Sequence, residues 1–185
     1  MKDFETIVCE RRSVRDFLDK PLTAADITFL AKAAGYAPSG LGCQTRRFYF
    51  IVGTEQLAAL NAIIEKSAAP AMRERISRRT KDGNFCFYYH APAVVLIADK
   101  AEGYAPMQDC CLAMQNLLLA AHARHLGACY LNQPYEQREN ADFRAFAESR
   151  LGMDPAYRVY AACALGHPDG VTPLLIKKQT NAIVI

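Results

Sequence analysis

The 185-residue sequence contains no tryptophan, no Cys-x-x-Cys pair, and no apolar run near the ~20 residues that cross a bilayer. Its seven cysteines are odd in number and unpaired in spacing, which argues against a disulfide framework and a four-thiolate zinc site. The first twelve residues carry Asp3, Glu5 and Glu10 and lack the apolar core of a signal peptide. We therefore expect a soluble, cytoplasmic protein with reduced thiols and no membrane partner.

Common catalytic signatures are missing as well. There is no phosphate loop of the Gly-x-x-x-x-Gly-Lys type and no Gly-x-Ser-x-Gly turn. A dinucleotide fingerprint beginning at Gly40 fails, because Thr45 occupies the place of its third glycine. His122 and His125 have the spacing of a metal pair on a helix, but no third ligand accompanies them, so we expect no metal site.

The composition is that of an ordinary globular domain, with 51% hydrophobic and 22% charged residues. The length predicts a single domain over residues 1–185. A net charge of +3 is too small to indicate nucleic-acid binding. Met72–Lys81 is locally basic, with five basic residues and one acidic residue, but a solvated helix explains this run equally well. We expect no nucleic-acid partner.

Apolar spacing predicts a chain in which helices and strands alternate, with four or five strands and about six helices. Predicted helices run from Phe4 toward Arg12, from an N-cap at Thr23 to Gly35, from an N-cap at Thr54, over Pro106–Leu126 with Gly127 at the end, and over about Glu136–Arg150. Predicted strands are Arg47–Val52, Ala93–Ile97, Ala128–Leu131, Tyr157–Leu165 and a strand-like tail, Ala182–Ile185. Ser67–Tyr89 has no clear pattern.

Two segments carry chemistry in their residues. Arg11-Arg-Ser-Val-Arg15 places three guanidiniums and a hydroxyl within five residues, which suits a phosphate group. The alternative is that these cations complement the carboxyl end of a helix. The Pro38–Gln44 loop holds two glycines, so its backbone can approach a flat ligand closely; an ordinary helix-to-strand connection is the alternative.

Five motifs in order along the chain resemble the FMN-dependent nitroreductase family. They are Glu10–Phe17, Ala37–Gln44 before an aromatic strand, His90–Ile97, Asp109 with Ala113–Leu118, and the pair Leu126–Tyr130 and Ala164–Pro168. The resemblance implies an α+β, three-layer fold in which helices flank a central mixed, mainly antiparallel sheet. It also implies a homodimer that exchanges a C-terminal strand and binds non-covalent FMN between its subunits.

The resemblance implies roles for individual residues. The phosphate and ribityl chain are assigned to Arg11, Arg12 and Ser13, and the flavin N1–C2 edge to Arg15. Further positions implied near FMN are Asn84 at the flavin, Gly127 and Ala128 over the ring near N5, and Gly166 and Lys178 at the phosphate. The partner subunit is expected to pack its own Pro38, Ser39, Gly40 and Gln44 against the ring.

The implied activity is hydride transfer from NAD(P)H to flavin N5 and then, in ping-pong order, to a small electron-poor acceptor such as a nitroaromatic or quinone. Because the cofactor carries the chemistry, no side chain is assigned a catalytic role. A non-catalytic flavin-binding or flavin-consuming relative is the alternative. Three departures from the family pattern bear on FMN affinity: Gly42 in place of Asn, Thr45-Arg46-Arg47 in place of Pro-Trp, and Lys177-Lys178 in place of a Pro-Arg segment.

Overall fold

The structure, a computed structural model, describes residues 3–170 and residue 183. A four-stranded sheet lies at its centre, with the strands in the order β1-β2-β4-β3. The strands are β1 (Arg47–Ile51), β2 (Ala93–Lys100), β3 (Gly127–Leu131) and β4 (Tyr157–Gly166). All three pairings among these strands are antiparallel, and β1 and β3 form the two edges.

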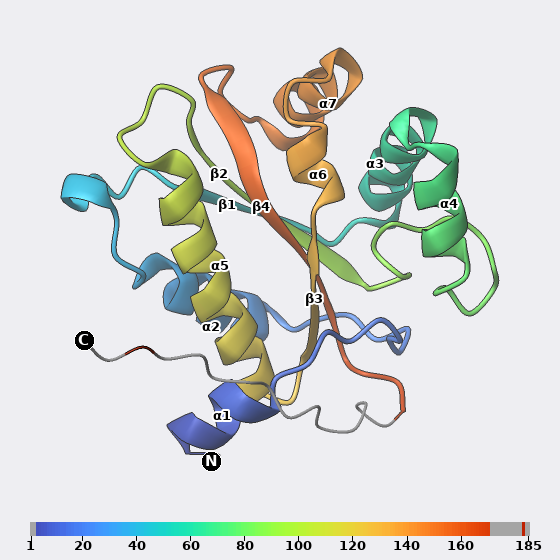
Figure 1. Ribbon diagram of the computed structural model, residues 1–185, viewed down its shortest axis with the longest axis horizontal. Coiled ribbons are helices and arrows are strands. Elements are labelled where there is room, and N and C mark those ends of the chain that lie inside the picture. Colours follow the sequence, from blue (N-terminus) through green and yellow to red (C-terminus); the bar gives the residue numbers. More distant parts are fainter. Residues whose placement is uncertain (1–2, 171–182, 184–185) are drawn as a thin grey trace.

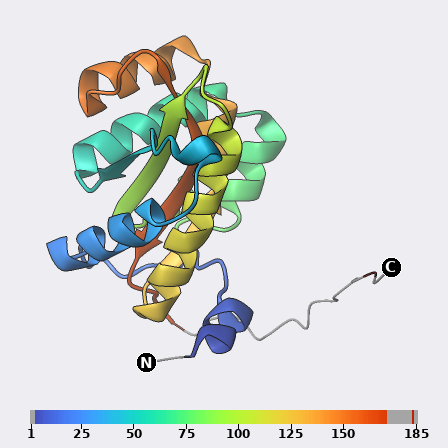
Figure 2. The same ribbon diagram turned by 90° about the vertical axis from the view of Figure 1, so that its left-hand side faces the viewer.

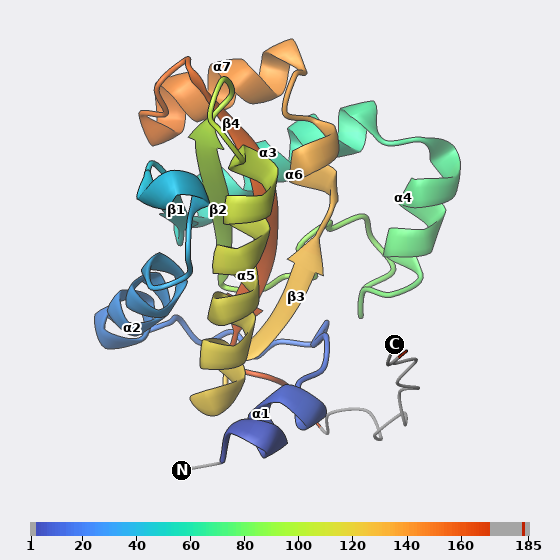
Figure 3. The ribbon, with the colours of Figure 1, turned by 60° about the vertical axis from the view of Figure 1, so that its left-hand side comes forward.

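Helices cover both faces of the sheet, which confirms the three-layer α+β prediction (Figure 1). On one face lie α2 (Ala24–Gly35) and α5 (Pro106–Ala123). On the other lie α3 (Thr54–Ser67), α4 (Pro70–Ser77), α6 (Gln133–Glu136) and α7 (Ala141–Leu151), as the turned view of Figure 2 also shows. The short α1 (Phe4–Glu10) lies beyond the carboxyl end of α5 (Figure 3).

Strand β2 divides the core into two clusters. Val94, Leu96 and Ala98 face the α3 and α7 side, whereas Val95 and Ile97 face α2 and α5. This alternation follows from the period of two in a strand, and burial on both faces explains why Ala93–Ile97 is apolar throughout. The predicted strand over Ala93–Ile97 is therefore confirmed, and it extends to Lys100.

Local capping chemistry explains where two helices begin. The Thr23 side chain accepts from the backbone N–H of Asp26, and the Asp26 carboxylate accepts from the N–H of Thr23, which is a capping box. Asn140 caps α7 in a similar way through the N–H groups of Asp142 and Phe143. The predicted cap at Thr23 is confirmed.

Several predicted boundaries were wrong. Thr54 is the first residue of α3 rather than its cap, since Gly53 holds the cap position without a side-chain hydrogen bond. The long helix ends at Ala123, so Gly127 begins β3 instead of ending α5. The segment 133–151 forms two helices, and α4 forms inside the stretch that shows no pattern. The predicted tail strand Ala182–Ile185 and the predicted strand exchange lie outside the described residues, apart from Ile183.

Within residues 3–170, no helix combines the length and the apolar character that a membrane crossing requires.

Candidate flavin site

The segment that contains the three predicted arginines runs beside edge strand β3. Ser13 forms a parallel bridge with Ala128, in which the N–H of Val14 donates to the Ala128 carbonyl at 3.0 Å. Further on, the N–H of Leu18 donates to the His167 carbonyl at 2.9 Å, just past the end of β4. The structure therefore brings Arg11–Arg15 together with the predicted positions at the start of β3 and the end of β4.

Close packing accounts for the two glycines predicted here. A Cβ on Gly127 would lie 2.8 Å from Val14 Cγ1, and one on Gly166 would lie 2.5 Å from Pro92 Cδ. Real Cβ atoms almost never come closer than about 3 Å to such groups, so both positions need glycine. Gly127 and Gly166 let the Arg11–Arg15 segment and Phe17 lie directly on the sheet.

Two of the arginines keep donors that no described residue uses. In residues 3–170, neither the Arg11 nor the Arg15 guanidinium donates a hydrogen bond to protein, and Arg15 Nε is buried without any partner. The Arg15 guanidinium lies 5.7 Å from the centre of the Tyr89 ring. A buried, unsatisfied donor on a cation is costly unless a ligand satisfies it. This observation fits an anionic or carbonyl-bearing ligand at this place.

Arg12 differs from its neighbours. Its Nη1 donates to the backbone carbonyls of Cys9 at 2.8 Å and of Arg11 at 2.7 Å. These are carbonyls at the carboxyl end of α1, where a cation is favourable. The alternative interpretation of the sequence, a cation that complements a helix end, therefore describes Arg12 in this structure.

A cleft of about 160 Å³ opens where this segment faces α5. Arg11, Arg12, His122 and His125 contribute its polar lining. The described residues contain no group of three or more His, Cys, Asp or Glu side chains placed to hold a metal ion. Two guanidiniums and two imidazoles around one small cleft favour an anion instead.

The electrostatics beneath the segment show the same concentration of positive charge. Burial raises the pKa of the Cys129 thiol on β3, while the Arg15 guanidinium, a hydrogen bond with Ser13, and the Arg11 guanidinium oppose that rise. Cys129 is 2% exposed. Its thiol is a structural neighbour of the site and remains protonated at neutral pH.

The predicted Pro38–Gln44 loop lies at the opposite, amino end of α5 (Figure 3). The N–H of Gly40 donates to both carboxylate oxygens of Asp109, at 2.9 and 3.1 Å, and the N–H of Gln44 donates to Ser39 Oγ at 3.0 Å. Leu41, Gly42 and Gln44 all have positive φ values, of 54°, 66° and 50°. The loop therefore has a fixed, tightly turned shape.

Arg46 is a functional candidate that the sequence did not single out. Its buried guanidinium donates to the carbonyls of Ala37 at 2.7 Å, Pro38 at 2.8 Å and Asp109 at 3.1 Å. It thereby ties both ends of the loop to the first turn of α5. Arg46 and Arg47 look alike in sequence, and only the strand alternation that follows them places one inward and one outward.

Asn84 is distant in sequence from the arginine segment, and its hydrogen bonds are made within its own turn. The side-chain amide of Asn84 donates to Asp82 Oδ2 at 3.0 Å. The backbone carbonyl of Asn84 accepts from Thr80 Oγ1 at 2.7 Å. These bonds form a local turn, in which no described residue donates to the side-chain amide oxygen. Lys178 lies outside the described residues, so its predicted role at the phosphate has no structural counterpart here.

One chain thus holds the predicted site in two separated parts. α5 has 18 residues, so its ends are roughly 27 Å apart at 1.5 Å per residue. The arginine segment is at one end and the Pro38–Gln44 loop at the other (Figures 1 and 3). The structure groups Arg11, Arg12, Ser13, Arg15, Gly127, Ala128 and Gly166, and it keeps Pro38, Ser39, Gly40 and Gln44 away from them.

Comparisons with known proteins identify chains that are similar to this one. The model of the nitroreductase family matches residues 8–167. A protein of Archaeoglobus fulgidus, whose name assigns it to the NADH dehydrogenases and NAD(P)H nitroreductases, is 28% identical over 91% of this chain and 87% of its own. An iodotyrosine deiodinase of Thermotoga neapolitana is 23% identical over 100% and 97%. A crystal structure of a nitroreductase with bound FMN from Bacteroides fragilis superposes with a TM-score of 0.87, at 27% identity and over 100% and 99% of the two chains.

Proposed function

The chain belongs to the nitroreductase family, and from this premise we propose that it is an FMN-dependent oxidoreductase that reduces a small electron-poor acceptor with NAD(P)H. The observation that carries the proposal is the Arg11–Arg15 segment, fixed against β3 with guanidinium donors that no described residue uses. When bound, FMN would supply the redox chemistry by taking up hydride from NAD(P)H and passing it to the acceptor.

The residues present fit FMN. Arg11 offers a fork of donors to a phosphate, and the Ser13 hydroxyl next to it suits a ribityl chain. Arg15 would place its charge beside the N1–C2 edge of the ring, where its buried Nε gains an acceptor. Negative charge that develops at that edge during reduction would be stabilised by at most roughly 4 kcal/mol, for a separation of ~4 Å and an effective dielectric constant near 20.

A second copy of this chain would complete the site. In one protomer the Pro38–Gln44 loop is held at the far end of α5 by Asp109 and Arg46. A homodimer in which each loop covers the partner's flavin brings the two parts together without any change in either. Ser39, Gly40 and Gln44 then act in the site of the other subunit, on a loop that is already rigid in its own.

A non-catalytic or flavin-consuming relative is the alternative. The similarity to an iodotyrosine deiodinase indicates that chains of this kind serve more than one reaction. The alternative predicts bound FMN in stoichiometric amount that neither NADH nor NADPH reduces.

A visible spectrum of the purified protein tests the proposal. We expect flavin absorbance that copurifies with the chain and bleaches on anaerobic addition of NADH or NADPH. Addition of a nitroaromatic should then restore the absorbance. A colourless protein that takes up no added FMN would overturn the proposal, and flavin that stays oxidised would favour the alternative.

A further inference from the structure

The aromatic stretch that precedes β2 places a ring against Arg15. The guanidinium carbon of Arg15 lies 5.7 Å from the centre of the Tyr89 ring, within the range of a cation–π interaction. Tyr89 is 8% exposed, and such a contact is stronger where water is excluded. In residues 3–170 no group accepts a hydrogen bond from the Arg15 guanidinium, and its Nε is buried. The ring contact therefore orients a cation that hydrogen bonds do not hold.

The backbone that carries this ring has an unusual conformation. Tyr89 and His90 have φ values of 56° and 55°, in the left-handed region that residues with a Cβ seldom adopt. Two such residues in succession persist only where the surrounding structure imposes the conformation. Strain that the fold maintains at a candidate site suggests that the site depends on the exact place of the side chain.

Hydrogen bonds fix this turn to the body of the protein. The N–H groups of Tyr89 and His90 donate to the carbonyl and the sulfur of Cys86, at 3.0 and 3.2 Å. Asn61 on α3 accepts from the N–H of Phe87 at 3.1 Å, just before the turn. The Tyr89 ring packs in the core cluster on the α3 and α7 side of the sheet. Tyr89 is thus part of the rigid framework, so its ring restrains the guanidinium beside it.

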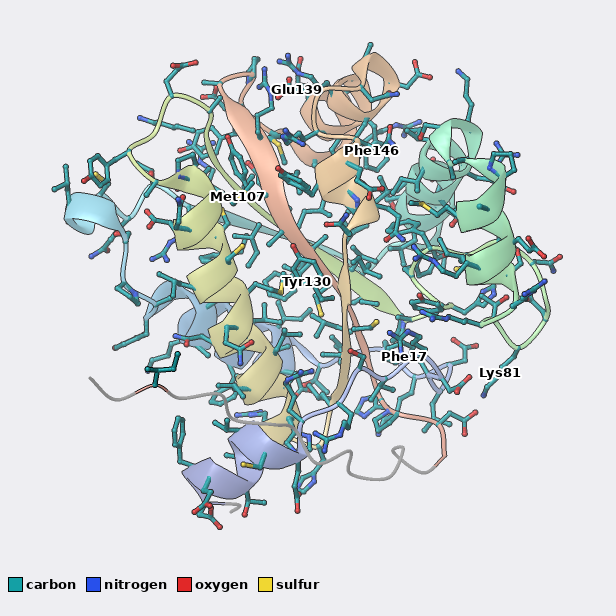
Figure 4. All side chains as sticks on the ribbon, viewed as in Figure 1. Phe17, Lys81, Met107, Tyr130, Glu139 and Phe146 are labelled. Atoms are coloured by element: carbon teal, nitrogen blue, oxygen red, sulfur yellow. The ribbon has the colours of Figure 1, made fainter. Side chains whose placement is uncertain are left out.

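The same turn supports the arginine segment at a second place. Pro92 packs against Gly166, where a Cβ would lie 2.5 Å from Pro92 Cδ and 2.8 Å from Phe17 Cδ1. Phe17 therefore lies at the end of the sheet where β2 begins and β4 ends (Figure 4). Because Phe17 follows Arg15 by two residues, residues 89–92 restrain both the backbone next to Arg15 and its side chain.

We propose that Tyr89 is a positioning residue for Arg15, whose ring keeps the guanidinium at the edge of the flavin and so favours reduced over oxidised FMN. The proposal rests on the proposed function for the place of the flavin. Negative charge develops at that edge on reduction, and a cation held in place stabilises it more than one that moves. Tyr89 acts through Arg15 and takes no part in the chemistry itself.

The test measures the midpoint potential of bound FMN, which does not depend on turnover. It compares Tyr89→Leu, which removes the ring, with Tyr89→Phe, which removes the hydroxyl alone. Tyr88→Leu is the matched control, because that ring belongs to the same turn but contacts the rings of Phe87 and His90, with centres 5.3 and 6.4 Å away. Tyr89→Asn also removes the ring, and asparagine tolerates the left-handed backbone.

We expect Tyr89→Leu and Tyr89→Asn to lower the preference for reduced over oxidised FMN about tenfold, which lowers the two-electron potential by ~30 mV. Tyr89→Phe and Tyr88→Leu should stay near the wild type. In an Arg15→Gln background, Tyr89→Leu should change nothing further, because the ring then has no cation to hold. An unchanged potential in Tyr89→Leu, or an equal fall without Arg15, would overturn the proposal.

A second measurement uses the flavin-free protein. In its NMR spectrum, the Arg15 Nε–H signal, identified by its loss in Arg15→Gln, should exchange slowly with water in the wild type and Tyr89→Phe. In Tyr89→Leu we expect exchange at least about tenfold faster. Free exchange in the wild type would overturn the proposal even if no variant folds. A wild-type protein that binds no FMN would overturn the proposed function, while this exchange rate would still decide whether Tyr89 holds Arg15.

Discussion

The arginines near the two ends of α5 differ in whether their guanidinium donors have acceptors within the protein. At the amino end, Arg46 is buried and donates to three backbone carbonyls, and Asp109 accepts from Gly40. At the carboxyl end, Arg11 and Arg15 have donors without protein acceptors in residues 3–170, and one of these, Arg15 Nε, is buried. A guanidinium with all its partners inside the fold stabilises the fold, whereas one left unpaired beside a cleft is available to a ligand.

The comparison predicts that Arg46→Met damages folding more than any change at the other end. Three backbone carbonyls, two of them in buried hydrogen bonds, would lose a charged donor, which should lower the free energy of unfolding by about 3–5 kcal/mol in urea denaturation. Arg47→Met is the matched control, because Arg47 is exposed and stacks 4.3 Å from the Tyr157 ring centre. It should cost no more than about 1 kcal/mol. Equal losses would show that Arg46 does not hold the loop.

Arg11→Ala should weaken FMN binding and leave the stability of the fold unchanged. We expect FMN to bind tenfold to a hundredfold more weakly, since a charge-assisted hydrogen bond contributes about 1.5–3 kcal/mol. The urea midpoint of the flavin-free protein should stay within experimental error, because no described residue accepts from this guanidinium. Fluorescence titration of the flavin measures the affinity. A loss of stability with unchanged FMN affinity would place Arg11 with the structural arginines.

Gly127→Ala tests how closely the arginine segment packs against the sheet. Its Cβ would meet Val14 Cγ1 at 2.8 Å and push the segment off the sheet, at a cost of roughly 1.5 kcal/mol in unfolding free energy. FMN affinity should fall with it. Gly35→Ala is the control: a Cβ there meets nothing within 4 Å, so that variant should be as stable as the wild type or more so. An unaffected Gly127→Ala protein would mean that the segment can shift freely.

The smallest effect is expected in the turn beside the arginine segment. Hydrogen bonds from Asn84, aided by His90, lower the pKa of Asp82 to about 2. The folded state therefore favours the carboxylate, and the resulting stability is present above the ordinary pKa near 3.8 and is lost as the pH falls toward 2. Asp82→Asn should unfold slightly more easily than the wild type at pH 6 and equally at pH 2. The exposed Glu102→Gln should show no such convergence, and a constant Asp82→Asn difference would contradict the assignment.

The sequence predicted those parts of the fold that depend on local patterns. The N-cap at Thr23, the strand at Ala93–Ile97 and the long helix that begins at Pro106 follow from spacing and side-chain type. For α4 it offered only a solvated helix as an explanation of the basic run Met72–Lys81 and predicted no bounds, because that helix buries Ile76 alone and has little apolar periodicity. Tertiary contact, rather than local preference, holds that helix in place.

The candidate site also has features that local sequence predicts and features that depend on tertiary contacts. The arginine motif was visible in the sequence, but the separation of its three members was not: Arg12 serves α1, whereas Arg11 and Arg15 remain available. The roles of Gly127 and Gly166 as contact points for Val14 and Phe17 depend on a bridge between segments more than one hundred residues apart. The strand was predicted to begin at Arg47, but the sequence did not show that the Arg46 side chain just before it would be buried against the carbonyls of Ala37, Pro38 and Asp109.

Helix α5 also connects the Pro38–Gln44 loop rigidly to the cleft at the arginine segment. Its hydrogen-bonded backbone resists stretching, so it holds the loop bound to Asp109 and the cleft lined by His122 at a fixed spacing. A one-turn insertion in α5 would lengthen that spacing by about 5.4 Å and leave each region locally intact. The number of residues in this one helix therefore sets the distance between the two parts of the proposed site.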